Sequence, residues 1–250
     1  MATRQRGGRL PLIMGTLAVV LLVLAALLMG MAGPAYRMEW VALGDAFEML
    51  RRGAYFAIGA GIVGIIALLV AVICRRTRPA VASGLVIIAC LGLLAVPWLH
   101  WQRAQDAPPI HDITTDTENP PAFNAVADAR TDAPNAVDYP GESTARQQLE
   151  AYPDIGPIVL NASLDNVRDA AEAEMRDRGW SMAHTGNETL EATVTTTWFG
   201  FEDDVVMRLT ETDGGVRVDM RSASRLGRGD AGTNAARIRD FLTALEARVE

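Results

Sequence analysis

The sequence predicts an α+β fold: a region of three transmembrane helices, then a two-layer domain in which an antiparallel sheet of about four to five strands has two helices on one face. The first observation is uneven charge. Residues 1–103 hold 10 Arg and 3 acidic residues, whereas residues 104–250 hold 13 Arg and 27 acidic residues. The second is a change from long apolar runs to short alternating ones. We therefore expect transmembrane helices at 1–103, a Pro-rich extended linker and draping segment at 104–152 and a soluble α+β domain at 153–250.

Three apolar runs define the membrane region: residues 10–32, 53–74 and 80–101. A helix needs about 20 apolar residues to cross the hydrocarbon core, and each run is long enough. None of the runs contains Asp, Glu or Arg, which argues against a transporter or a channel. The first run is too long for the core of a cleaved signal peptide, so we expect a retained helix.

Arginines flank these runs unevenly and predict their orientation, because positively charged short loops stay in the cytoplasm. They precede the first run and fill the turn between the second and third: Arg4, Arg6, Arg9, Arg75, Arg76 and Arg78. The N-terminus is then cytoplasmic, and three crossings place the C-terminal domain outside the cytoplasm. For a bacterial inner membrane that compartment is the periplasm. Trp98 and Trp101 are expected at the outer interface.

The second apolar run is rich in small residues at four-residue spacing, such as Gly53, Ala57 and Gly61. This spacing lets helix backbones approach closely in lipid. Two interpretations stay open, which are packing among the three helices of one chain and a face through which the chain forms an oligomer.

Prolines dominate the segment that follows, from Pro108 to Pro140, and favour extended structure. Ile113 and Phe123 are expected to anchor this segment on the domain. A short helix is expected at about 142–151.

The remaining chain alternates between helical spacing and strand alternation. Ser163 is a good helix N-cap, and Gly179 suits the end of that helix. The expected elements are an edge strand at 155–160, a helix at 164–178, strands at 180–184, 190–198, from 205 and at 216–224, and a helix at 234–248. In the last strand Val, Met and Ser share one face, and Arg and Asp share the other. We therefore expect an antiparallel meander with one packed face and one face in solvent.

The densest polar run joins the last strand to the last helix. Its candidate residues are Arg221, Ser222, Ser224, Arg225, Asp230, Asn234 and Arg237. In a structural interpretation, the arginines pair with neighbouring carboxylates. These carboxylates are Asp203, Asp204, Asp219 and Asp230. In a functional interpretation, three arginines and a helix N-terminus form a pocket for a carboxylate, a phosphate or a lipid headgroup.

Three segments resemble a known family. They are Ile113-Thr-Thr-Asp116 with Pro120, Pro121 and Phe123, then Phe199-Gly-Phe-Glu-Asp-Asp-Val-Val206, then Arg221-Ser-Ala-Ser-Arg225 with Gly227, Asp230, Gly232, Asn234 and Arg237. They are similar to the domain of unknown function family numbered 1499, over roughly residues 108–248. The resemblance implies an envelope or membrane-associated bacterial domain, often anchored by N-terminal membrane helices. It implies no established activity, cofactor or catalytic residue.

Two classes of function follow from these observations. The first is a non-enzymatic binding or assembly module of the cell envelope, whose partner is membrane lipid, an envelope protein or an anionic ligand. The second is a small hydrolase-like enzyme, which needs a nucleophile beside a base and an orienting group. Its candidates are Ser222 or Ser224, His111 or His184, and Asp112 or Asp230. We favour the first class and assign no catalytic residue, because both serines lie on the expected core face.

Other chemistry has little support in the sequence, and we expect no cofactor and no metal. His111-Asp112 and Asp116-x-Glu118 lack a recognised ligand spacing. Glu202-Asp203-Asp204 is an acidic cluster able to hold Ca²⁺ weakly, but we favour a solvated turn or partners for the arginines. Both cysteines, Cys74 and Cys90, lie in apolar runs. The acidic C-terminal part would repel a phosphate backbone, which excludes nucleic acid as a partner.

Overall fold

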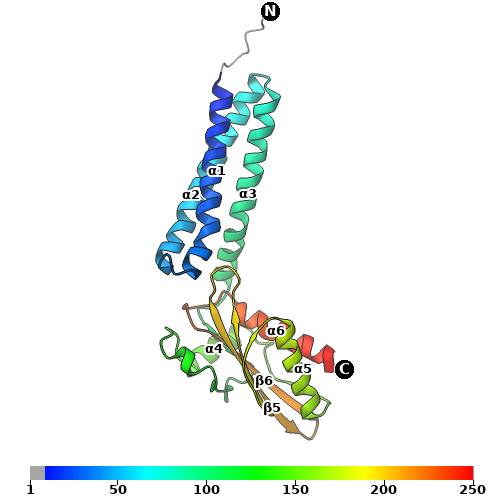
Figure 1. Cartoon of the computed structure of the whole chain (residues 1–250). Helices are drawn as coiled ribbons and strands as arrows, with labels where there is room; N and C mark the ends of the chain where they lie inside the picture. The colour runs from blue at the N-terminus through cyan, green and yellow to red at the C-terminus, as the bar shows by residue number, and fades with distance from the viewer. Residues whose placement is uncertain (1–8, 250) are drawn as a thin grey trace, which may run out of the picture. The chain divides into compact units, whose positions relative to one another are not determined.

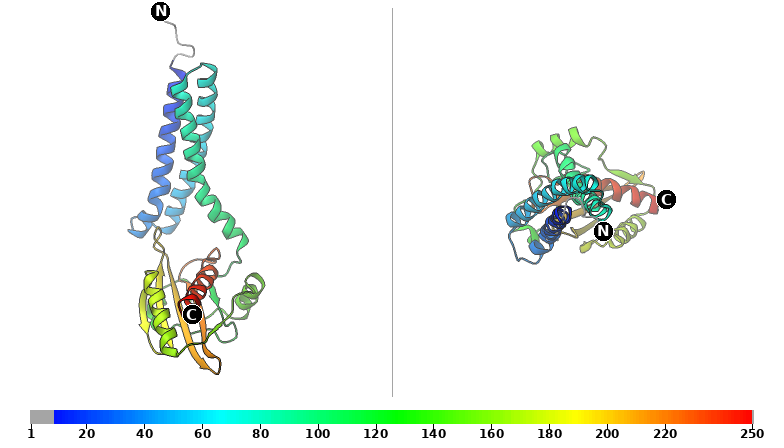
Figure 2. Two further views of the ribbon diagram at one scale, coloured as in Figure 1. Left: turned by 90° about the vertical axis from the view of Figure 1, so that its right-hand side faces the viewer. Right: turned by 90° about the horizontal axis from the view of Figure 1, so that it is seen from above.

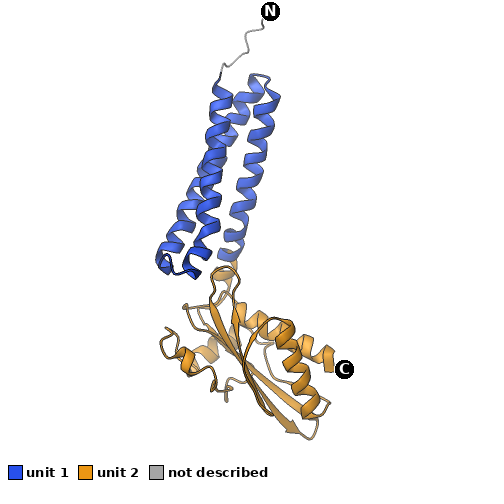
Figure 3. Ribbon diagram, viewed as in Figure 1, with its two compact units in different colours: residues 1–101 blue, residues 102–250 orange. Residues whose placement is uncertain are grey.

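The computed structural model describes residues 9–249, in two compact units that divide between Trp101 and Gln102 (Figure 3). Arg4 and Arg6, which contribute to the predicted orientation, lie outside the described residues.

The first unit consists of long helices: α1 (Leu10–Arg37), α2 (Leu43–Ile73) and α3 (Thr77–Asp106), whose last residues belong to the second unit. All three are long and apolar enough to cross a membrane. Each extends beyond the apolar run that predicts it, and in α2 side-chain pairs one turn apart stabilise the polar extension. In α2, Glu48 accepts hydrogen bonds from two arginines placed in this way.

The small residues of α2 are packed within this chain. A Cβ atom on Gly53 would lie 2.4 Å from Cγ of Met29 and 3.1 Å from the carbonyl oxygen of Ala25, both in α1. Ala57 and Ala60 are fully buried. The small side chains therefore let α1 and α2 approach each other closely.

A six-stranded antiparallel sheet forms the second unit, with the order β1-β6-β5-β4-β3 and with β2 also paired to β6 (Figure 1). The strands are β1 (Asp112–Thr114), β2 (Ile158–Leu160), β3 (Ser181–Thr185), β4 (Thr189–Thr195), β5 (Glu202–Thr212) and β6 (Gly215–Ser224). The predicted α+β class is confirmed, as is the meander from β3 to β6. The sheet has one strand more than expected, because β1 is only three residues long and gives no readable alternation.

Helices α5 (Leu164–Asp177) and α6 (Thr233–Val249) lie beside each other along one face of the sheet (Figure 2). The main apolar core lies between them and the sheet. Within it the rings of Trp180 and Phe241 stack, with centroids 5.2 Å apart. Ser163 caps α5 as predicted, since its side chain accepts a hydrogen bond from the backbone N–H three residues later.

The opposite face, which the alternation predicts to lie in solvent, is covered. Residues 115–140, called the strap below, lie on this face, and Phe123 from the strap packs against Val206 of the sheet. Arg221 beneath the strap is 2% exposed. The strap and the segment after it contain two short helices: η1 (Asp128–Arg130) and α4 (Glu142–Ala151). The expectation of a solvent-exposed face is therefore wrong, because alternation identifies residues that share a face but not the segment that covers them.

We expect Gly215→Ala to destabilise the second unit. Gly215 begins β6 with a φ of +120°, and a Cβ atom there would lie 2.1 Å from the carbonyl oxygen of Leu160 in β2. The strained backbone alone costs about 1–3 kcal/mol, and β2 must also shift. Thermal unfolding of the full chain in detergent measures the loss. Gly214→Ala is the matched control, because its Cβ would meet nothing closer than 3.8 Å. Equal midpoints for the two variants would contradict this account.

Candidate functional site

The seven candidate residues do not form one site, because β6 distributes them over both faces of the sheet. Arg221 and Arg225 point toward the strap, where their carboxylate partners lie. Ser222 and Ser224 point toward the helices, where both contact Asn234 of α6. Two separate polar networks result, one on each face.

Arg221 is held by Asp112, the first residue of β1. Its Nε and one terminal nitrogen bind the two carboxylate oxygens of Asp112 at 3.0 and 2.7 Å, with both side chains almost completely buried. Two further hydrogen bonds reach the strap carbonyl groups of Pro121 and Val137. The guanidinium also lies 4.4 Å from the centroid of the Phe123 ring. The predicted partners of Arg221 did not include Asp112, which lies 109 residues away in the sequence.

Asp204 of β5 is the centre of the second buried pair. Arg225 binds both of its oxygens at 2.8 Å, and Arg130 of the strap adds a hydrogen bond at 2.8 Å. Burial of Asp204 alone would raise its pKa, but hydrogen bonds from Arg225, Thr193 and Arg130 outweigh burial and lower the pKa below its ordinary value. At Asp112, burial outweighs the arginine and raises the pKa.

Arg130 is the residue that sequence reasoning missed most completely. It is 1% exposed and binds Asp204 together with the backbone carbonyls of Ala136, Ala223 and Ser224. It lies among prolines and polar residues, where no periodic pattern indicates burial.

A further carboxylate fastens the strap to the sheet. Glu191 of β4 is 1% exposed, and its carboxylate accepts hydrogen bonds of 3.0–3.1 Å from the backbone N–H groups of Asn124, Ala125 and Val126. Three consecutive amides directed at one point are a favourable anion site, and here the protein's own carboxylate fills it. The strap is thus bound to the sheet by charged groups along its length.

On the helix face the polar network centres on Asn234, which is completely buried. Its side-chain oxygen accepts a 2.7 Å hydrogen bond from Ser222, and its nitrogen donates to Ser224 at 3.0 Å. Arg237 donates to Ser222 at 2.7 Å and to Asp203 at 2.5 Å. Asp203 therefore pairs with Arg237, and this is one of the pairings that the sequence predicts.

Asp230 lies at the N-terminus of α6, the position where the functional interpretation of the polar run places a bound anion. Its carboxylate accepts hydrogen bonds from the backbone N–H groups of Gly232 at 3.0 Å and Asn234 at 2.5 Å. Burial raises the pKa of Asp230, against these hydrogen bonds. The partial positive charge of the helix terminus thus already has an anionic partner.

The geometry does not favour nucleophilic catalysis at the serines. Ser222 contacts an amide and a guanidinium, and neither group takes up a proton as a base does. His184 is exposed in β3, and His111 contributes only its backbone carbonyl to Asn234. Burial lowers the pKa of the His111 imidazole. Within residues 9–249, no three His, Cys, Asp or Glu side chains converge to hold a metal ion.

A comparison with protein-family models gives a match to the family described as "Protein of unknown function (DUF1499)" over residues 112–245, which is more than half of the chain. The chain belongs to the DUF1499 family. The matched range begins at β1 and therefore includes the strap, both arginine–carboxylate pairs and the Asn234 network. No curated protein matches the chain. Because the function of this family is unknown, the match assigns no activity to the DUF1499 domain.

Arg221→Ala is expected to lower the stability of the DUF1499 domain by about 3–5 kcal/mol, because it leaves the Asp112 carboxylate buried without its partner. Arg176→Ala is the control: Arg176 pairs with Glu172 on the surface of α5, where such a pair contributes about 0–1 kcal/mol. Unfolding of the full chain in detergent compares the two. A loss in Arg221→Ala no larger than in the control would show that the buried pair does not hold the strap.

Tyr139→Phe is expected to protect the domain against alkali. The Tyr139 hydroxyl is buried without a hydrogen-bond partner among the described atoms, and burial raises its pKa to about 12. The unfolded phenol ionises near pH 10, so stability is full below about pH 10 and is lost as the pH rises toward about 12. The variant cannot ionise, and its thermal midpoint should fall less over this interval, with no loss at neutral pH. An identical alkaline decline in both proteins would refute the assignment.

Proposed function

We propose that this chain is a non-enzymatic binding or assembly module of the cell envelope. In this proposal, three membrane helices hold the DUF1499 domain on the periplasmic side of a bacterial inner membrane, where it engages an envelope partner. The proposal rests on one observation: the arginines of the polar motif bind carboxylates within the domain itself. Each of Arg221, Arg225 and Arg237 pairs with a carboxylate of the same domain.

The hydrogen bonds of Arg221 illustrate this internal pairing. A guanidinium has five N–H groups, and four hydrogen bonds from Arg221 go to Asp112 and to two backbone carbonyls. A carboxylate or phosphate ligand would have to displace Asp112 from a site that solvent barely reaches. These contacts therefore favour the structural interpretation of the motif over the anion pocket. They give the domain a rigid framework, whose exposed surface is left for recognition.

Charge supports the proposed orientation. Arg75, Arg76 and Arg78 lie in or next to the three-residue connection between α2 and α3, and Arg9 precedes α1. The loop between α1 and α2 also carries Glu39. The positive-inside tendency therefore supports a cytoplasmic turn and a periplasmic C-terminal domain.

Reporter fusions test the orientation in living cells. Alkaline phosphatase fused after Glu250 should be active, whereas a fusion after Arg76 should be inactive, because the enzyme matures only outside the cytoplasm. Green fluorescent protein fused at the same two positions is the control and should show the opposite pattern. A fluorescent C-terminal fusion with an inactive phosphatase fusion would exclude a periplasmic domain.

Purification of the full chain in mild detergent, followed by mass spectrometry, tests the assembly role. We expect an envelope protein in a fixed ratio to the chain, retained by Arg176→Ala and lost from the destabilised Arg221→Ala. A chain that purifies alone and hydrolyses ester substrates would overturn the proposal in favour of the enzyme alternative.

A further inference from the structure

We infer that one end of the DUF1499 sheet contacts the lipid bilayer through the aromatic hairpin Thr196–Phe201, which joins β4 to β5. The inference rests on the proposed membrane anchoring but not on the proposed partner. It assigns a lipid-binding surface to a part of the domain that the arginine motif does not include.

The hairpin combines three aromatic rings with a well-fixed backbone. Thr196 and Phe201 pair through their backbones at 2.8 Å, and the Thr196 hydroxyl accepts a further hydrogen bond from the N–H of Phe201. The rings of Phe199 and Phe201 stack with centroids 4.8 Å apart, and Trp198 packs edge-on against Phe199. Trp198 is nevertheless 43% exposed. Rings of this kind, fixed at a tip and partly exposed, suit the interface between lipid and water, where Trp is enriched.

The register of the sheet places this hairpin at the end where the chain enters the domain. Thr195 pairs with Glu202 next to the hairpin, and Asp203 beside it pairs with Ser224. The carbonyl of His111, the residue before β1, accepts a hydrogen bond from the N–H of Ser224. The hairpin between β5 and β6 lies at the other end of the sheet (Figure 1).

The length of the connection limits which end can reach the membrane. Five residues, 107–111, separate the end of α3 from β1, and they span about 17–20 Å when extended. The eleven residues of β5 carry the sheet about 35 Å farther in the other direction. The short connection therefore favours the entry end, which includes the aromatic hairpin, as the end that approaches the bilayer.

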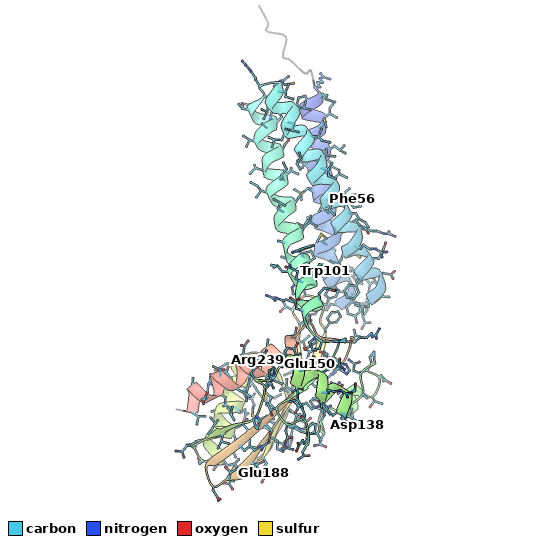
Figure 4. All side chains as sticks on the ribbon, turned by 180° about the vertical axis from the view of Figure 1, so that it is seen from behind. Phe56, Trp101, Asp138, Glu150, Glu188 and Arg239 are labelled. Atoms are coloured by element: carbon cyan, nitrogen blue, oxygen red, sulfur yellow. The ribbon has the colours of Figure 1, made fainter. Side chains whose placement is uncertain are left out.

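Exposed charges lie at both ends of the sheet. Arg228, in the loop after β6 at the entry end, is exposed. Of the acids at this end, Glu202 pairs with Arg225 and Asp230 caps α6, whereas Asp106 and Glu150 are exposed. The far end carries further exposed acids that an anionic lipid surface would repel. These are Glu188, which Figure 4 labels, Glu211 and Asp213.

Fluorescence quenching in bilayer nanodiscs of phosphatidylcholine and phosphatidylglycerol tests the inference on the full chain. Single bimane labels are placed by Thr197→Cys at the hairpin, Asp213→Cys at the far end and Ile88→Cys in α3, in a background with Cys74→Ser and Cys90→Ala. We expect nitroxide-bearing lipid to quench the labels at 197 and 88 but not the label at 213. Aqueous iodide should quench only the label at 213.

A second pair of variants tests the aromatic rings themselves. Adding Trp198→Ser and Phe199→Ser to the Thr197→Cys protein should abolish lipid quenching and expose the label to iodide. Val159→Ser removes a side chain of β2 that is 56% exposed away from the hairpin, and it should change neither signal. Equal unfolding midpoints of the variants show that the fold is kept.

Three outcomes overturn the inference. In the first, iodide quenches the label at 197 and lipid nitroxide does not, while lipid nitroxide still quenches the label at 88. The hairpin then does not contact lipid, although the membrane anchoring is retained. If the label at 197 is shielded from both quenchers, the hairpin contacts protein instead of lipid. If the label at 88 is not quenched by lipid either, the anchoring fails together with the inference.

Discussion

Two buried arginine–carboxylate pairs, Arg221 with Asp112 and Arg225 with Asp204, are what the rest of the domain depends on. Each pair lies between the sheet and the strap, where solvent scarcely reaches it. Removing charges from water is costly, and the cost is offset only when every hydrogen-bonding group finds its partner. Arg221 needs β1 and two strap carbonyls, and Asp204 needs Arg130 of the strap. The charges therefore permit one position of the strap on the sheet and penalise others.

This constraint changes the meaning of the arginine-rich motif. As a sequence it resembles an anion site, because three arginines, flexible glycines and a helix N-terminus lie within twenty residues. In the folded domain each of these positive groups has an internal carboxylate: Asp112, Asp204, Asp203 and Asp230. The motif is then a structural framework, and under the proposed function recognition belongs to surfaces without such pairs. The aromatic hairpin is such a surface, since its ring contacts involve no buried ion pair and Trp198 is 43% exposed.

The parts of the fold that the sequence predicts are those set by local periodicity. Apolar runs indicate α1 to α3, helical spacing indicates α5 and α6, and alternation indicates β4 to β6, including the burial of Ser222 and Ser224. The sequence indicates that the Pro-rich segment drapes over the domain, with Phe123 as an anchor, but not which face it covers. The contacts of that face are distant in sequence: 109 residues separate Arg221 from Asp112, and 74 separate Arg130 from Asp204. Glu191 shows the same limit. It alternates as a solvent-facing residue would, yet it is buried under strap amides.

The strong acidity of the second unit also has a physical explanation in this arrangement. Residues 104–250 carry fourteen more acidic residues than arginines, which would oppose close approach to an anionic membrane if the charge were spread evenly. It is not spread evenly, because several of the acids are neutralised within the strap and helix networks and others lie exposed at the far end of the sheet. The entry end carries the aromatic rings and Arg228, together with the exposed acids Asp106 and Glu150. In the proposed contact with the bilayer, the short tether and the aromatic tip act together, and no ligand in the arginine motif is required.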